Sequence, residues 1–148
     1  MTPFLVLTVS TLAIRAIGAA GVAAFDRWSV CLRLGLAAMF LMTASAHWGK
    51  RRRDLVRMVP ATFPRPELIV TITGLLEILG AVGLLVPATA RVAAICLALL
   101  LVAMFPANVS AAHRNLTIDG KAVTGLPLRT LLQAVFIAAL GAAGFGHF

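Results

Sequence analysis

The fold is decided by the apolar stretch ELIVTITGLLEILGAVGLLV, which runs from Glu67 to Val86. A helix needs about 20 apolar residues to cross the roughly 30 Å hydrocarbon core of a bilayer, and this stretch has that length. Its only charged residue after the first position is Glu77, which lies near the middle. The stretch therefore predicts a transmembrane helix with a carboxyl group deep in the membrane.

Four further stretches of the chain are similarly long and apolar. Together with the first, the predicted membrane helices are Phe4 to Ala24, Ser29 to His47, Glu67 to Val86, Ala90 to Ala112, and Pro127 to Gly146. The 148 residues are 61% hydrophobic and only 12% charged, which leaves too few polar side chains to cover a water-soluble domain. We therefore predict an all-α fold, a polytopic transmembrane helix bundle that forms a single domain over residues 1–148.

The first apolar stretch has a second interpretation as a secretory signal, because Val22, Ala23 and Ala24 form a small-residue cleavage pattern. Such a signal also needs a basic region before its apolar run, and none is present there. Arg15 in the middle of the run further favours a helix that is retained in the membrane.

The positive charges predict the orientation of the helices, since cytoplasmic loops of membrane proteins carry an excess of Lys and Arg. The basic residues on one predicted side are Lys50, Arg51, Arg52, Arg53, Arg57, Arg65, Arg114, Lys121 and Arg129. Arg27 and Arg91 fall on the other side. We therefore predict a multi-pass protein of the inner (plasma) membrane, with Met1 in the cytoplasm and Phe148 outside.

The same distribution of charge favours the lipid bilayer over nucleic acid as the partner of the protein. The formal net charge is +8, but the basic residues gather at the ends of apolar runs and not on an amphipathic face, which argues against nucleic-acid binding. The lipid bilayer is the expected partner. The basic loop from Lys50 to Arg65 has a second interpretation as a specific site for anionic lipids or for another protein.

Three ionisable residues lie within the predicted membrane helices, namely Arg15, Arg33 and Glu77. Each costs at least about 2.5 to 3.5 kcal/mol in the bilayer, so it should face the protein interior and have a partner. We therefore expect Arg15 or Arg33 to form an ion pair with Glu77.

Other polar residues are predicted in the cytoplasmic half of the bundle. Asn108 and Gln133 lie within about 9 Å of the ends of their helices, and His47 lies at the end of its own. Thr73 shares a helix face with Glu77, four residues away. These side chains either form one functional centre or only hydrogen-bond the helices together. The histidines lack metal-binding spacing, so no metal site is predicted.

Four segments give the chain its likeness to a known family. They are LRLGLAAMF (Leu32 to Phe40), MVPATFPRPEL (Met58 to Leu68), TGLLEILGAVGLLVPATARVAAICLALLLVAMFPANV (Thr73 to Val109) and LPLRTLLQ (Leu126 to Gln133). The glutamate in a glycine-rich helix, the FPAN turn and the Arg-to-Gln spacing are specific in combination. Over most of its length, the chain resembles the DoxX-like family of small bacterial integral membrane proteins.

The resemblance implies a four-helix DoxX-like core at residues 29–148, to which residues 1–25 add an N-terminal transmembrane helix. The polar interior that it implies contains Glu77, Asn108, Arg129 and Gln133. Some members of the family look like subunits of thiosulfate:quinone oxidoreductase, and others are associated with oxidative-stress or thiol complexes. The chain departs from the family pattern at Thr130 and Leu131, where a Leu-Pro-like step is expected, so the bend of the last helix does not follow from the resemblance.

These patterns favour an integral membrane subunit of redox or thiol/quinone-linked metabolism. Glu77 and His47 are the candidate catalytic residues, because carboxyl and imidazole groups exchange protons near neutral pH when their surroundings tune them. A quinone is the cofactor that this hypothesis implies, and its candidate binding residues are Asn108, Gln133, Arg129, Arg33 and Thr73. Since no flavin, haem or iron–sulfur motif is visible, the electrons would come from a redox-enzyme partner.

Two alternatives to this function stay open. The first is a small-molecule transporter or binding protein, which would need a homo-oligomer and would be supported by a discontinuous helix near Pro106. The second is a membrane scaffold without turnover, in which the polar residues only specify packing.

Cysteine labelling tests the predicted orientation. In a variant without the native Cys31 and Cys96, a membrane-impermeant maleimide added outside intact cells should label Phe148→Cys and leave Arg52→Cys unlabelled. The reason is the excess of positive charge on the side of Arg52. Labelling of position 52 and not of position 148 would invert the predicted topology.

Overall fold

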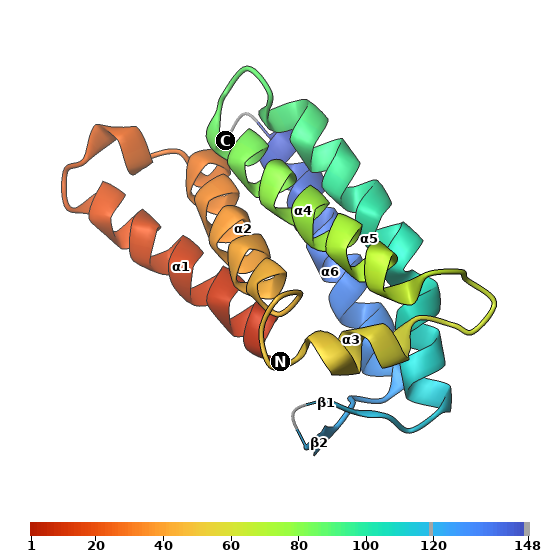
Figure 1. The fold of residues 1–148 in the computed structure, drawn as a ribbon. Coiled ribbons are helices and arrows are strands. Elements are labelled where there is room, and N and C mark those ends of the chain that lie inside the picture. The colour runs from red at the N-terminus through yellow and green to blue at the C-terminus, as the bar shows by residue number, and fades with distance from the viewer. Residues whose placement is uncertain (119, 147–148) are drawn as a thin grey trace.

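A computed structural model describes residues 1–118 and 120–146 and confirms the all-α bundle (Figure 1). In the described residues, 5 helices are long and apolar enough to cross a membrane. They are α1 (Thr2–Ala19), α2 (Trp28–Ser45), α4 (Pro66–Leu85), α5 (Ala90–His113) and α6 (Leu126–Phe145). The chain is a multi-pass membrane protein. The prediction for Phe148 lies outside the described residues.

The first membrane helix is shorter than predicted, since α1 ends at Ala19 and not at Ala24. Gly21 has a φ of 110°, a left-handed conformation that stops the helix and that glycine adopts without strain. A short 3-10 helix, η1 (Ala23–Phe25), then leads into α2.

Two short elements in the connections were not predicted. The helix α3 (Arg52–Met58) lies between α2 and α4, and β1 (Thr117–Ile118) pairs antiparallel with β2 (Lys121–Ala122) before α6. A small hydrophobic cluster of Met58, Ala111 and Leu116 holds α3 and the β1 segment against α5. These elements therefore form because the ends of the long helices give them an apolar surface to cover.

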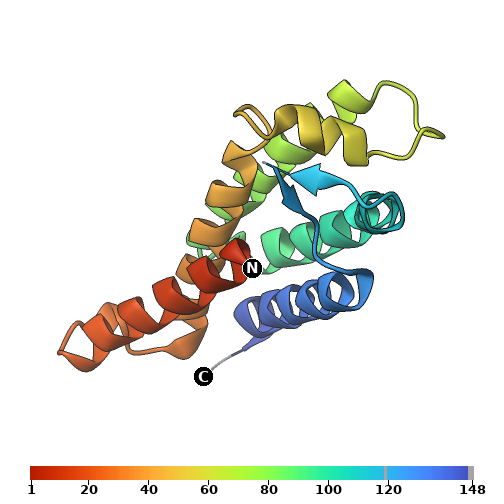
Figure 2. The same cartoon turned by 90° about the horizontal axis from the view of Figure 1, so that it is seen from below.

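The central helices form a ring in which α2 packs against α4, α4 against α5, α5 against α6, and α6 against α2. The helix α1 lies alongside α2 at the edge of the bundle (Figure 2). The core inside this arrangement contains the fully buried Leu36, Phe40, Leu84, Leu97 and Leu140. The architecture is thus a four-helix core with one additional N-terminal helix.

Glycines allow the helices to approach closely. A Cβ atom on Gly74 of α4 would lie 2.7 Å from the Cβ atom of His47, and one on Gly83 would lie 2.8 Å from the Cβ atom of Ala93 on α5. Lipid tails are as apolar as the side chains, so the hydrophobic effect does not drive membrane helices together. Small residues allow close van der Waals packing, which drives the association instead. The helix α4 therefore packs tightly against both of its neighbours.

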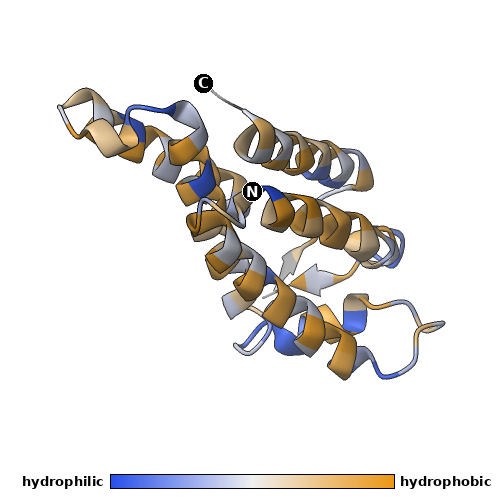
Figure 3. Cartoon of the chain, turned by 90° about the horizontal axis from the view of Figure 1, so that it is seen from above, coloured by the Kyte–Doolittle hydropathy of each residue, from blue (hydrophilic) through white to orange (hydrophobic). Residues whose placement is uncertain are grey.

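Apolar residues make up most of the long helices, as the hydropathy colouring in Figure 3 shows. Large side chains such as Leu79 and Leu99 are 67% and 64% exposed. Contiguous exposure of this kind would be unfavourable in water but is favourable against acyl chains. These faces are where the protein contacts the lipid bilayer.

The two ends of the bundle differ in their connections. The N-terminus, α3 and the β1–β2 pair lie at one end, and η1, the α4–α5 connection and the end of α6 lie at the other (Figure 1). The α3 end includes most of the basic residues outside the membrane helices, among them Arg52, Arg53, Arg57 and Arg65. We refer to it below as the basic end.

Gly74→Ala should destabilise the protein by about 1 to 3 kcal/mol, because the added methyl group would overlap the base of the His47 side chain. Unfolding in mixed micelles with increasing SDS measures this change. Gly141→Ala is the matched control, since a Cβ atom there meets nothing within 4 Å. Equal losses in the two variants would show that the α2–α4 contact is not close.

Candidate functional site

Glu77 lies on α4 and is only 3% exposed, with its carboxyl group facing α2. The hydroxyl oxygen of Thr43 on α2 lies 2.8 Å from Glu77 Oε2 and 3.0 Å from the carbonyl oxygen of Phe40. Both groups can accept a hydrogen bond from Thr43, whose hydroxyl has a single proton. A buried carboxyl group is thus held at a helix–helix contact by one hydroxyl.

The predicted ion pair of Glu77 with Arg15 or Arg33 is wrong for the part of the chain that the structure describes. Arg15 lies near the end of the bundle opposite the basic end. Its guanidinium nitrogen lies 3.3 Å from Asp26 Oδ1, and the guanidinium stacks on the ring of Trp28. Arg33 is on α2, but it precedes Thr43 by ten residues, which is about 15 Å along a helix. Neither guanidinium is at the level of Glu77.

His47 follows one helical turn after Thr43 and is buried next to Gly74. Its Nδ1 atom lies 3.3 Å from the carbonyl oxygen of Thr43 and 3.2 Å from that of Ala44. Carbonyl oxygens only accept, so Nδ1 carries the proton and Nε2 keeps a free lone pair in the neutral ring. Burial lowers the pKa of His47, and the nearby Arg52 adds to this effect, against the two carbonyl hydrogen bonds.

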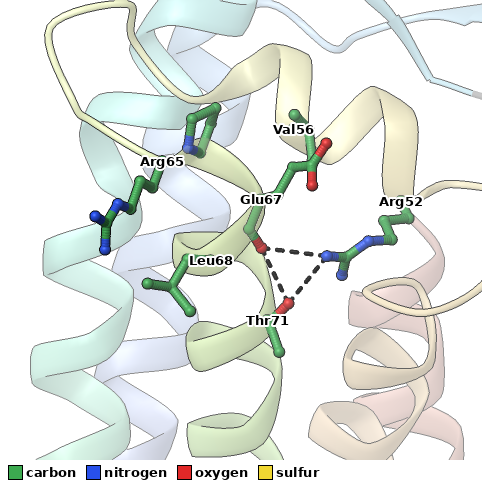
Figure 4. Close-up of a pocket in the computed structure, with 7 residues that line it drawn as sticks. Arg52, Val56, Arg65, Glu67, Leu68 and Thr71 are labelled. Atoms are coloured by element: carbon green, nitrogen blue, oxygen red, sulfur yellow. Dashed lines mark hydrogen bonds between the residues drawn. The ribbon is translucent and has the colours of Figure 1, made fainter.

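Arg52, at the start of α3, connects this region with the surface of the basic end. It donates hydrogen bonds to the carbonyl oxygens of His47 (2.8 Å) and Glu67 (3.2 Å) and to the Thr71 hydroxyl (2.9 Å), and Figure 4 shows the last two. The sequence had indicated Arg52 only as one charge among several. Its role in joining α2, α3 and α4 depends on the path of a connection that no motif predicts.

Asn108, Arg129 and Gln133 form a second polar set between α5 and α6. Arg129 donates to Asn108 Oδ1 at 3.0 Å, and the Asn108 amide donates to Gln133 Oε1 at 3.4 Å. The structure therefore brings these three predicted residues together. Arg129 forms no ion pair with an acidic residue in the described part of the chain, and its buried Nε has no hydrogen-bond partner there.

The predicted polar residues form two sets and not one centre. Across the described residues, no hydrogen bond or ion pair connects Glu77, Thr43 and His47 with the set on α5 and α6. Thr73 belongs to neither, because its hydroxyl donates to the carbonyl oxygens of Ile69 and Val70 on its own helix.

The helix α5 continues through Pro106, from Ala90 to His113. The break that would have favoured a transporter is therefore absent.

Two surface grooves lie away from Glu77. An open groove of about 520 Å³ lies between α3 and the start of α4 at the basic end (Figure 4). A second groove of about 330 Å³ lies between α5 and α6 and is lined by apolar residues, among them Ile95, Leu99 and Ile137. The apolar lining of this second groove suits an acyl or isoprenoid tail, whereas the first groove is lined by charged and polar side chains as well as apolar ones.

A double-mutant cycle tests the polar set on α5 and α6. Asn108→Ala and Arg129→Ala should couple by about 0.6 to 1.7 kcal/mol in SDS-induced unfolding, the range for hydrogen bonds between membrane helices. Arg129→Ala with Thr73→Val is the control cycle and should be additive, since no contact joins these residues in the described structure. Additivity in both cycles would contradict the Arg129–Asn108 bond.

Comparison with known proteins gives one family for the region that contains both polar sets. The model of a family described as a domain of unknown function (DUF8561) matches residues 36–144. No curated protein matches the chain, and no solved structure matches it either. The matched region begins within α2 and ends within α6, so it covers most of the four-helix core and leaves out α1. The chain belongs to the DUF8561 family.

Proposed function

We propose that this protein is an integral membrane subunit of redox or quinone-linked metabolism, in which Glu77 exchanges a proton with a lipid-soluble carrier. One observation carries the proposal: a buried carboxyl group lies in a membrane-spanning helix with a hydroxyl partner and without a cation in the described structure. An ionisable residue in such a position is costly, and membrane proteins retain such residues mostly for the movement of ions or protons.

The contact with Thr43 suits proton exchange, because it satisfies both forms of the carboxyl group. When Glu77 is ionised, the hydroxyl of Thr43 donates to Oε2. When Glu77 is protonated, it donates to Thr43, and Thr43 donates to the carbonyl oxygen of Phe40. Rotation of one hydroxyl group therefore accommodates the proton without movement of a helix.

His47 extends the proposed site toward the basic end. Burial lowers the pKa of His47, which favours the neutral ring, and Nε2 of that ring has the lone pair to which a proton can add. It lies between the level of Thr43 and the Arg52 side chain at the surface. In this proposal His47 receives protons from the aqueous side, and Glu77 transfers them to the carrier within the membrane.

A quinone is the class of carrier that we propose, since its reduction takes up two protons and two electrons. The electrons come from a partner redox protein of the same membrane, because the sequence contains no visible redox motif. The resemblance to the DoxX-like family supports this proposal, as does the predicted location in the inner membrane of a bacterial cell.

A second candidate function is a membrane scaffold without turnover. It is favoured by Asn108, Arg129 and Gln133, which hydrogen-bond to one another directly and so have fewer groups left for a ligand. Direct bonds of this kind specify how helices pack. In this alternative, Glu77 would only fix α2 against α4.

Substitution of Glu77 separates the two functions. For proton exchange, Glu77→Gln and Glu77→Leu should equally abolish the carboxyl C=O band change that quinone or quinol induces in the infrared difference spectrum. Glu77→Gln should nevertheless unfold at a higher temperature than Glu77→Leu, because the amide keeps the hydrogen bond from Thr43.

Two threonine variants are the controls for this experiment. Thr43→Val should shift the carboxyl band, whereas Thr73→Val should leave it unchanged, since the hydrogen bonds of Thr73 in the described part of the chain stay within its own helix. An unchanged spectrum in Glu77→Gln would remove Glu77 from the proposal. Absence of any band change in the native protein would favour the scaffold.

A further inference from the structure

The groove at the basic end has the composition of a lipid head-group site. It lies between α3 and the first turn of α4, and its lining residues are Arg52, Val56, Arg65, Pro66, Glu67, Leu68 and Thr71. We propose that this groove binds the head group of an anionic phospholipid, of the phosphatidylglycerol class, from the membrane leaflet at the basic end. The proposal does not depend on the function proposed for Glu77.

Arg52 is a fixed positive charge in this groove. Three of the five N–H donors of a guanidinium are used in the bonds to His47, Glu67 and Thr71, and all three acceptors are neutral oxygens. These bonds hold the guanidinium in place and leave its charge without an acidic partner in the described part of the chain. Two N–H donors remain for a ligand.

Arg65 supplies the second positive charge. It is exposed, lies directly before α4 as the N-cap residue, and forms no ion pair or side-chain hydrogen bond in the described structure. In Figure 4 the Arg65 and Arg52 side chains lie on opposite sides of Glu67. The positive end of the α4 dipole adds to the attraction of this region for an anion.

The charges of the groove match a phosphodiester lipid with a neutral polar head. Arg52 and Arg65 contribute two positive charges and Glu67 one negative charge, which leaves a net charge of one positive unit. One phosphodiester group balances this charge. The Glu67 carboxylate accepts hydrogen bonds, so it fits the hydroxyl groups of a glycerol head.

The surface below the groove favours a lipid over a soluble phosphate compound. Leu68 lines the groove, and Ile72, Leu75 and Leu79 follow it at the spacing of one helix face. All four are exposed. A head group in the groove would therefore have its acyl chains along an apolar face that continues into the membrane.

Native mass spectrometry of the full-length protein in detergent tests this site. Phosphatidylglycerol should bind more tightly than phosphatidylcholine with the same acyl chains, and Arg65→Gln should weaken phosphatidylglycerol binding about fivefold, the effect of about 1 kcal/mol per basic residue. Arg53→Gln removes the same charge from exposed surface outside the groove and should change binding less than about twofold.

Three outcomes would overturn the proposal. Equal binding of the two lipids would show that the head group is not recognised. Equal losses in Arg65→Gln and Arg53→Gln would show a general attraction to the basic loop and no defined groove. Competition by glycerophosphoglycerol, which has the head group without acyl chains, at the same concentration as the lipid would indicate a site for soluble anions.

Discussion

The hydrogen bond between Thr43 and Glu77 is the constraint on which the arrangement of α2 and α4 depends. No water is present in the hydrocarbon core to solvate an unpaired carboxyl group, so the two helices must bring a partner to it. This requirement fixes the register of α2 against α4. One helical turn from this bond, Gly74 leaves space for the His47 side chain. The carbonyl oxygen of His47 accepts a hydrogen bond from Arg52 of α3.

In the described residues, neither polar set of the bundle contains an ion pair. Glu77 is hydrogen-bonded by the hydroxyl group of Thr43, and Arg129 donates a hydrogen bond to the amide oxygen of Asn108. Bringing the acid and the cation together would have stabilised both charges and fixed both protonation states. Their separation leaves the carboxyl group with a hydroxyl partner that can donate to its ionised form and accept from its protonated form, which is the physical basis of the proposed proton exchange.

The basic end differs from the membrane helices in its short connecting elements and in its arginines. Its connections contain α3 and the paired strands, which cover the ends of the long helices. Its arginines also act in different ways, since Arg52 is anchored by three hydrogen bonds and Arg65 is free of them in the described structure. An anchored charge beside an exposed one gives a groove with defined geometry, where a flexible basic loop would give only a diffuse attraction.

The sequence by itself determined the five membrane helices and the residues that need partners, because apolar length and the cost of a buried charge are properties of short segments. It did not determine the partner of Glu77, since neither Arg15 nor Arg33, the two arginines predicted for that role, pairs with it in the described structure. The choice of partner depends on the rotation and register of whole helices. The side of a membrane helix that faces lipid and the side that faces the protein are both apolar, so the sequence does not distinguish them. Only the tertiary structure, through close contacts such as that of Gly74 with His47, decided which polar groups meet.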